Sequence, residues 1–410
     1  MAVLNTTTFA AALKTLYSKE KVRNVVYDSN PFLAMVPKMT NFTGDGLKIP
    51  ILWNDPVGLS ADFATAQSNQ SSSSQSAFTL TRVKEYGVAV IDGELIEASK
   101  GNEGAFLEAT KREIDGVLHG VARRISIGLY RDRAGSIGQI SAGSNVGTAT
   151  ITLANPEEIV NFYVGQKLVA SATEGNTGGL RSAGATVTLT AVDRDAGTLT
   201  ASGNWSAGIA AVAASDYLFT EGDQTGTASA NKVAGLSAWV PSSAPGATTF
   251  FGVDRSVDTD RLGGVRVDGS SLNIAEALMK GCARLAREGA KPDVIFMPFD
   301  QYLNLINYLG SKVQFVDLKA GGVGFQALLV HAPHGAVKVV PDGACKPGRA
   351  FALQMDTWKL ASLGECPHIL DADGNRMLRQ STADQYEVRV GAYYQLGCYA
   401  PGYNANITLP

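Results

Sequence analysis

Apolar residues at every second position mark two strands in the first quarter of the chain. One strand is predicted over 45–53, and the pattern resumes over 77–92 with a bulge expected near residues 82–83. The tract QSNQSSSSQS at 67–76 lies between them and is too polar to bury apolar surface. We therefore predict a long two-stranded hairpin whose tip is mobile in an isolated chain, and which needs another surface to lie on.

The segment ahead of this hairpin has apolar residues but no neighbouring pattern to pack against. Phe9 and Leu13 share one face of a short helix expected at 6–17. We expect Pro31 to stop any helix and residues 32–36 to run extended. The segment is thus predicted to be an arm.

A period of 3.6 residues predicts three further helices. The longest runs from 103 to about 131 behind Asn102 as its N-cap, with apolar residues every three or four positions. At 1.5 Å per residue it is roughly 43 Å long. Its internal glycines weaken it, so neighbouring elements have to hold it in place. Shorter helices are expected at 272–288 and 300–309.

Residues 140–224 differ from the rest in charge and pattern. They contain 3 basic and 8 acidic residues, with short β-prone runs between Gly, Asn and Asp turns. The runs are 148–153, 166–170, 185–192, 198–202 and 216–220. They predict a small antiparallel β-barrel or sandwich, inserted as a domain of its own. Further strands are expected at 292–297, 337–340, 349–355, 358–363, 377–380 and 386–398.

Composition narrows the class of protein. A chain of 410 residues is long enough for two or three domains, and 45% hydrophobic with 18% charged residues describes an ordered fold. The net charge of −3 argues against a protein that reads nucleic-acid sequence. We see no export signal and no apolar run that could span a bilayer, and therefore expect folding in the cytoplasm. In that compartment the cysteines are best interpreted as small buried side chains.

The sequence contains few residues that could form a catalytic or metal-binding site. The side chains that could form a zinc site are His331, His334, Cys345, Cys366 and His368. Pro333 prevents the helix that would align the two nearest histidines, so loop histidines and buried cysteines are favoured over zinc. The DADGN run at 371–375 begins like a calcium loop but has no glutamate at the twelfth position, which favours a turn.

Four arginines at 123, 124, 131 and 133 could meet phosphate. Acidic residues are interspersed among them, which favours a solvated helix face or salt bridges between subunits. No catalytic constellation and no cofactor motif is predicted anywhere in the sequence.

The order of the predicted parts is more specific than any single motif: arm, hairpin, long helix, inserted β-domain, α/β core and long terminal strand. The informative stretches are NPFL at 30–33, TFFGVDR at 249–255, PDVIFMP at 292–298 and YEVRVGAYYQLGC at 386–398. In this order they resemble the major capsid proteins of tailed double-stranded DNA bacteriophages, the HK97-fold family. The resemblance spans nearly the whole chain. It implies an α+β HK97-like capsid fold with an inserted small antiparallel β-domain.

The resemblance also implies a division of the chain. Residues 1–40 would be the N-terminal arm, 41–95 the extended E-loop hairpin, and 96–139 the spine helix of the peripheral domain. Residues 140–224 would form a barrel-like accessory domain. The α/β core would occupy 225–410, with the axial domain at roughly 300–350 and strands of the peripheral domain at 350–410.

The function implied is that of a shell subunit without catalysis or cofactor. It would self-assemble into pentamers and hexamers of an icosahedral head around double-stranded DNA, which it would touch non-specifically. The implied partners are other copies of the chain, a scaffolding protein supplied in trans and a portal protein. Whether a decoration protein binds the insert is left open. Assembly would take place in the host cytoplasm, without membrane contact. The alternatives are an exported or surface β-rich adhesion module and, less favoured, a metalloenzyme.

Self-assembly is also favoured by the pattern itself. An arm, a hairpin and an unusually long helix expose apolar faces that one subunit cannot cover, whereas many copies laid edge to edge can. The expected assembly contacts are Phe9, Leu13, Phe32, Leu33, Trp53, Phe63, Phe78, Arg123 and Arg124.

Overall fold

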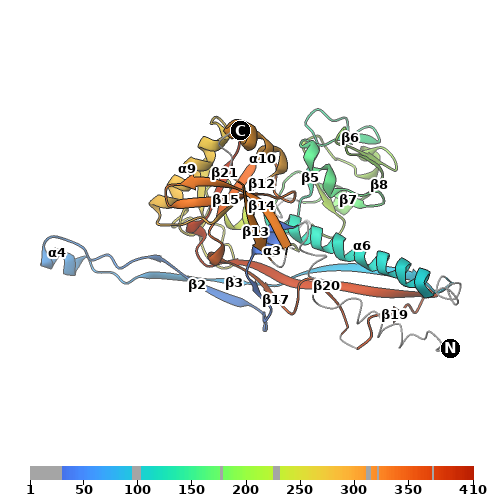
Figure 1. Cartoon of the computed structure of the whole chain (residues 1–410), viewed down its shortest axis with the longest axis horizontal. Coiled ribbons are helices and arrows are strands. Elements are labelled where there is room, and N and C mark those ends of the chain that lie inside the picture. The colour runs from blue at the N-terminus through green and yellow to red at the C-terminus, as the bar shows by residue number, and fades with distance from the viewer. Residues whose placement is uncertain are drawn as a thin grey trace.

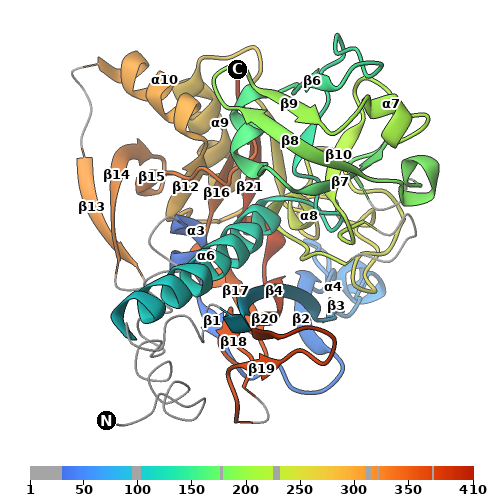
Figure 2. The same cartoon turned by 90° about the vertical axis from the view of Figure 1, so that its right-hand side faces the viewer.

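The computed structural model describes residues 30–94, 103–175, 179–224, 231–310, 315–320, 323–371 and 374–410. The molecule is elongated: a hairpin projects from one end, and a long helix lies along a sheet toward the other (Figure 1). Two compact bodies stand above this base, one α/β and one β-rich. They lie side by side when the molecule is turned by 90° (Figure 2).

The projecting hairpin consists of β2 (Leu47–Asn54) and β3 (Ser74–Leu80), joined by a tip that contains the short helix α4 (Phe63–Ser68). The two strands pair antiparallel. Successive residues in the middle of β2 are alternately buried and exposed, as the sequence predicts. The hairpin expected from the sequence is therefore confirmed, although its tip contains a helical turn.

The second strand of the sequence prediction is wrong in its extent. Residues 77–92 do not form one strand, because β4 (Val83–Asp92) leaves the hairpin and pairs with the long strand β20 instead. At the break, the Thr81 carbonyl accepts a hydrogen bond from Gln395 Nε2 at 2.9 Å. Arg82 Nη1 also donates a hydrogen bond, to the Phe42 carbonyl at 2.5 Å. These bonds turn the chain from one sheet to the next.

The segment expected to run extended after Pro31 is a helix, α3 (Pro31–Met35). Proline is well tolerated in the first turn of a helix, where its missing N–H has no partner in any case. It therefore begins a helix here and does not prevent one. The ring of Phe32 packs against Tyr130 and Phe296, with centroids 5.4 and 5.3 Å away. The helix expected at 6–17 lies outside the described residues.

The long helix is confirmed as α6 (Glu103–Tyr130). Its apolar stripe is buried against β4 and the core, through Ile114, Leu118, Val121, Ile125 and Leu129. The contact with β4 is close at Gly87, where an added Cβ would lie 2.6 Å from Val121 Cγ2 and 2.7 Å from Val117 Cγ1. The expected cap at Asn102 lies outside the described residues.

Replacing Gly87 with valine should destabilise the subunit by about 1–3 kcal/mol, because the new side chain overlaps two valines on a helix that cannot retreat without losing its own core. Urea unfolding followed by circular dichroism measures the change. Gly246→Val is the matched control for steric overlap, since Gly246 is exposed, has no positive φ, and nothing lies within 4 Å of a Cβ added there. An effect of Gly87→Val below that of the control would contradict the close packing of α6 on β4.

The base of the molecule is a sheet organised around β20 (Gln385–Cys398). Its other members among the described residues are β4, β1 (Lys38–Met39), β17 (Trp358–Ser362), β18 (His368–Ile369) and β19 (Leu378–Arg379). The strands expected at 358–363, 377–380 and 386–398 are thereby confirmed. β4 lies on one side of β20, where α6 covers one of its faces.

The β-rich body is an antiparallel sheet with the strand order β5-β10-β7-β8-β9-β6. The strands are β5 (Gly138–Gln139), β6 (Thr150–Thr152), β7 (Lys167–Ser171), β8 (Val187–Asp193), β9 (Thr198–Ala201) and β10 (Tyr217–Thr220), with the turns η1 (Pro156–Asn161), η2 (Arg181–Gly184) and α7 (Trp205–Gly208). A bridge between Ile140 and Leu153 joins the two edges into a small barrel around its own core. Five of its six strands match sequence predictions, and β5 was not expected.

The α/β body is a seven-stranded sheet with the order β11-β21-β16-β12-β15-β14-β13. The strands are β11 (Val265–Asp268), β12 (Val294–Met297), β13 (Phe315–Ala320), β14 (Val323–Ala332), β15 (Gly335–Pro341), β16 (Arg349–Leu353) and β21 (Ala405–Thr408); the helices and the turn are α9 (Ile274–Arg287), α10 (Phe299–Leu309) and η5 (Pro401–Tyr403). The short helix α8 (Leu236–Trp239) packs against α6, and the turn η4 (Met355–Thr357) leads from β16 into β17. α9 packs on this sheet and against α10, and both helices agree with the sequence prediction. The strands β11, β13, β14 and β21 were not expected.

Candidate assembly surface

The side chains predicted to make assembly contacts divide between core and surface. Phe32, Leu33 and Phe78 are fully buried among side chains of this same chain. Assigning these three to an assembly surface is therefore wrong, because nothing of them is left to contact another copy. Phe9 and Leu13 lie outside the described residues.

The projecting hairpin carries the exposed apolar side chains. Phe63 is 80% exposed and Leu59 is 88% exposed, and both lie near the tip. Leu52 and Val57 are also more than half exposed. Trp53 is half-buried and donates through Nε1 to Ser76 Oγ at 3.3 Å. A monomeric protein rarely leaves such a group of large apolar side chains in water, so the hairpin surface is a candidate for binding.

Local hydrogen bonds hold the tip together although it has no buried core. The Asp62 carboxylate caps α4 by accepting from Thr65 N at 2.9 Å and from Thr65 Oγ1 at 2.8 Å. These bonds lower the pKa of Asp62. Val57 and Ser71 join the two sides of the tip, since the Val57 carbonyl accepts from Ser71 N at 2.9 Å. The exposed side chains are therefore presented by an ordered turn.

A second apolar surface lies on β4, on the face that α6 does not cover. Tyr86, Val88 and Val90 are 53, 49 and 43% exposed and stand at alternate positions in one row. The ring of Tyr86 packs edge-on against Tyr393 of β20 at 5.9 Å. The sequence carries a signal for this row, because residues 88–91 are apolar without alternation. Such a strand indicates that both of its faces become covered.

Arg124, expected on a solvated face or in a bridge between subunits, is instead bonded within this chain. Its Nε lies 2.5 Å from Glu85 Oε1, and its Nη2 lies 2.7 Å from Asp223 Oδ1. Lys232 Nζ completes the group by bonding to Glu85 Oε2 and lying 3.7 Å from Asp223. The four side chains, called the junction network below, connect β4, α6 and the end of the β-rich body.

The junction network is largely buried, with Glu85 and Lys232 each about 95% covered. Burial acts to raise the pKa of Glu85, but the charges of Lys232 and Arg124 outweigh it and hold that pKa below its usual range. Burial raises the pKa of Asp223, which the same two cations only partly offset. Two cations and two carboxylates balance in charge, which is the condition for keeping them away from water.

The remaining arginines of the proposed phosphate cluster point to different partners. Arg131 pairs with Glu158 at 2.7 Å, and both side chains are 3% exposed. Arg133 lies over the ring of Phe251 at 4.6 Å. Arg123 lines a cleft between α6 and the β-rich body, and its Nε has no hydrogen-bond partner among the described residues. They do not converge on one anion site.

The histidines and cysteines do not converge either. His331 lies in β14, and His334 lies in the turn that follows this strand. His334 Nε2 is 3.3 Å from the carbonyl oxygen of Ala286 in α9. His368 belongs to another sheet. Burial raises the pKa of Cys345 well above its usual value, which is typical of an inert core thiol. Within the described residues, no group of three or more potential ligands could hold a metal ion.

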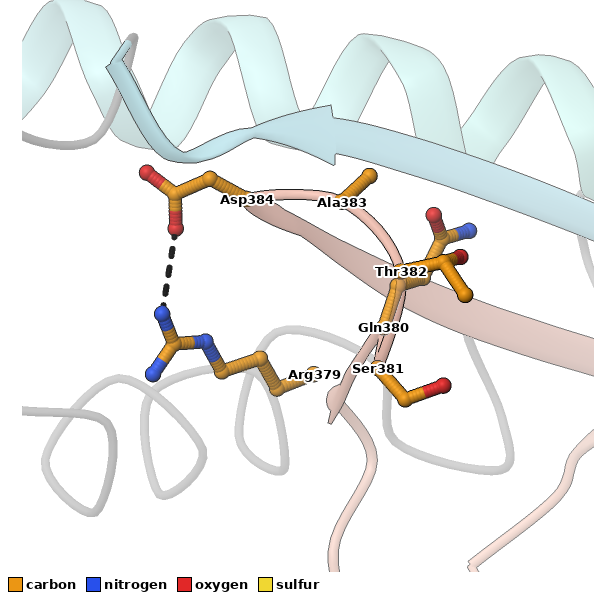
Figure 3. Close-up of a pocket in the computed structure, with 6 residues that line it drawn as sticks. All are labelled: Arg379, Gln380, Ser381, Thr382, Ala383 and Asp384. Carbon is orange, nitrogen blue, oxygen red and sulfur yellow. Dashed lines mark hydrogen bonds and ion pairs between the residues drawn. The ribbon is translucent and has the colours of Figure 1, made fainter.

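An open hollow lies at the turn between β19 and β20. Figure 3 shows the six residues that line it, Arg379, Gln380, Ser381, Thr382, Ala383 and Asp384. Arg379 Nη2 and Asp384 Oδ1 lie 3.3 Å apart, and both side chains are more than two-thirds exposed. A surface ion pair of this kind contributes little energy. The turn has neither a nucleophile with an adjacent base nor an apolar wall, so its geometry supports no reaction.

Comparison with known structures identifies the fold. The capsid asymmetric unit of cyanophage A-1(L) is similar to this chain at a TM-score of 0.51 and 11% identity, covering 95% of this chain and 92% of the other. The capsid of a native GTA particle is similar at a TM-score of 0.42 and 8% identity, covering 96% and 92%. No curated protein sequence matches the chain. The first of these similarities shows that the chain has an HK97-like fold.

The sequence comparison adds a match over part of the chain. Residues 213–380 match the family model described as SU10 major capsid protein. The resemblance to the major capsid proteins of HK97-fold phages that the sequence carries is thereby confirmed. The partial match and the fold support a structural role as a capsid protein. No helix in the described part of the chain has the length and apolar character needed to cross a membrane.

Proposed function

We propose that this capsid protein forms the pentamers and hexamers of an icosahedral head around double-stranded DNA, and that its hairpin joins neighbouring copies. The observation that carries the proposal is the exposure of Leu59 and Phe63 on an ordered tip. The hairpin extends well beyond the two compact bodies (Figure 1), so its own subunit has no surface with which to cover these side chains. Another copy of the chain can cover them.

The row formed by Tyr86, Val88 and Val90 is the surface that we propose receives the hairpin of a neighbour. Both surfaces are apolar, and they belong to distant parts of the subunit. A contact between two different patches of the same chain is head-to-tail, and repeated around an axis it closes into a ring. Rings of this kind are the pentamers and hexamers of the proposal.

The division of the chain follows the same proposal. Residues 41–95 would act as the E-loop, with β4 anchoring it, and 96–139 as the spine helix. Residues 140–224 would be an accessory domain. The segment at roughly 300–350 would lie near capsomer centres, and 350–410 would supply the strands of the peripheral domain. The N-terminal arm, 1–40, would contribute further contacts.

The proposed partners are a scaffolding protein supplied in trans and a portal protein, with assembly in the host cytoplasm. The net charge of −3 supports non-specific and weak contact with packaged DNA, since a strongly basic wall would immobilise it. We propose no catalytic step, because the described polar clusters serve as ion pairs that hold the subunit together.

The test replaces both tip side chains in the variant Leu59→Ser/Phe63→Ser. Particle yield, measured by sedimentation and negative-stain microscopy, should fall about tenfold or more, because each 1.4 kcal/mol lost from a contact is a factor of ten. Unfolding in urea should change by less than about 0.5 kcal/mol, since neither side chain is buried in the subunit.

The matched control is Ala61→Ser/Ala64→Ser, which adds two hydroxyls to the same exposed tip but removes little apolar surface. It should assemble normally. Normal particle yield from the Leu59→Ser/Phe63→Ser variant would show that the tip does not join copies.

A further inference from the structure

A cleft of about 800 Å³ lies where three parts of the molecule meet. Its floor is α6, one side is the η1 turn of the β-rich body, and the other is the start of α10 with the loop after β15. The β-rich body and the α/β body stand on its two sides (Figure 2). Pockets that bury most of a ligand measure about 300–1,000 Å³, so this cleft is large enough for several side chains.

Large apolar side chains stand uncovered on both sides of the cleft. Phe299, at the start of α10, is 60% exposed, and Tyr163, shortly after η1, is 47% exposed. The ring of Phe299 rests against the loop after β15, because a Cβ added at Gly343 would lie 2.7 Å from its Cε2. The floor is open, since nothing lies within 4 Å of a Cβ added at Gly116 or Gly120. The cleft thus offers apolar contacts that the described part of the chain does not use.

The charges that line the cleft leave an acidic excess. Arg131 and Glu158 pair with each other at 2.7 Å. Of the remaining Asp, Glu, Lys and Arg side chains that line it, Glu157 and Asp300 are acidic and only Arg123 is basic. An occupant that combines apolar side chains with positive charge is therefore favoured.

The described part of the chain begins at this cleft. Its first residue, Asn30, is itself one of the residues that line it. The segment 1–29 is therefore attached at the edge of the cleft. It contains more basic than acidic side chains: Lys14, Lys19, Lys21 and Arg23 against Glu20 and Asp28. Its charge complements that of the cleft.

The helix expected at 6–17 has the spacing of a helix that binds in a groove. Phe9, Leu13 and Leu16 stand at positions i, i+4 and i+7, which share one face. Helices shorter than about 12–15 residues are marginal in water, so this one needs a surface to pack on. The connection 18–29 spans up to about 40 Å when extended, at about 3.3 Å per residue. It is therefore long enough to let the helix turn back onto the cleft of its own subunit.

We propose that residues 6–17 dock on this cleft in their own subunit, with Phe9 and Leu13 inserted between Phe299 and Tyr163. The docked helix bridges the β-rich body and the α/β body above α6. This assigns Phe9 and Leu13 to a contact within the subunit, and leaves the opposite face of the helix for the contacts between copies proposed for the arm.

Hydrogen exchange of the unassembled full chain, followed by mass spectrometry, tests the docking. In the natural chain, residues 6–17 should exchange about tenfold or more slowly than an unstructured peptide of the same sequence. Phe299→Ser should remove most of this protection, because it removes one apolar wall. Tyr308→Ser is the matched control, since Tyr308 is 56% exposed on the same helix but does not line the cleft. Both variants should unfold in urea like the natural chain, because both side chains are exposed.

The reciprocal variant is Phe9→Ser/Leu13→Ser. It should speed the exchange of 160–165 and 298–303 by about threefold or more, because the two walls lose their cover. Thr7→Ser/Ala11→Ser places the same residue type on the opposite face of the helix and should leave the exchange of both walls as it is in the natural chain.

Three outcomes would overturn the proposal. One is exchange of residues 6–17 in the natural chain at the rate of the unstructured peptide, which would leave the cleft to a different protein. Another is protection of residues 6–17 that Phe299→Ser does not change, which would place the helix elsewhere. The third is protection that arises only when the subunit concentration is raised, which would assign the cleft to the segment of another copy.

Discussion

Replacing Lys232 with methionine should destabilise the subunit by about 3–5 kcal/mol, the cost of removing one partner from a buried ion pair. The variant would leave Glu85 and Asp223 with Arg124 as their remaining cation in the junction network. Because Lys232 is only 5% exposed, water cannot take over its role without opening the contact between α6 and the β-rich body. Urea unfolding of the isolated subunit measures the loss.

The control for Lys232→Met is Lys167→Met. Lys167 is 58% exposed and lies 3.9 Å from Glu221, so its removal should cost less than about 1 kcal/mol. Adding Glu85→Gln to Lys232→Met should recover part of the stability, since it removes the charge that the first change left unpaired. A loss for Lys232→Met no larger than for Lys167→Met would contradict a structural role of the junction network.

Replacing Trp239 with alanine should cost about 3–5 kcal/mol through the cavity that it leaves in the core. The indole is fully buried, and its aromatic neighbours are Phe78 at 5.0 Å, Phe250 at 5.1 Å, Phe251 at 5.8 Å and Trp358 at 6.4 Å. Its Nε1 donates to the Leu396 carbonyl at 3.1 Å. Phe78 belongs to β3, so the same change should also loosen the base of the hairpin.

The measurements are urea unfolding and hydrogen exchange of β3. The variant Trp239→Phe keeps most of the ring but leaves the Leu396 carbonyl without its donor, so it should cost less, about 1–3 kcal/mol. If Trp239→Ala lowered stability while exchange in β3 stayed as slow as in the natural chain, the hairpin would not depend on this aromatic cluster.

Elements that stand on strong local patterns were predictable from sequence. The apolar stripe along α6 recurs every three or four residues from Ile114 to Leu129, and the strands of the β-rich body are bounded by Gly, Asn and Asp turns, so period and boundaries agree. The strands β13 and β14 were missed, because a run such as VGFQALLVHA mixes glycine with apolar residues and has no clear period. Local sequence also could not separate β3 from β4, since the break depends on Gln395, more than 300 residues away.

The assembly surface was predictable in kind but not in detail. Sequence alone indicated that apolar residues of the arm and hairpin exceed what one subunit can cover, yet Phe78 and Phe63 look alike in the sequence. The first is buried against Trp239 and the second is exposed in α4, a difference that only tertiary packing decides. The junction network could not be predicted from sequence either, because its four members come from separate parts of the chain.

The pairing of β5 with β10 brings the entry and exit of the small barrel next to each other, with Gln139 opposite Tyr217. A foreign polypeptide with adjacent ends could therefore be grafted between these two points without altering the path of the host chain. Such a graft would have to supply its own counter-charge for Arg131, which now relies on Glu158 in the exchanged part. The subunit thus offers a place where a foreign polypeptide can be displayed, provided that the polypeptide carries an acidic side chain where the exchanged part now has one.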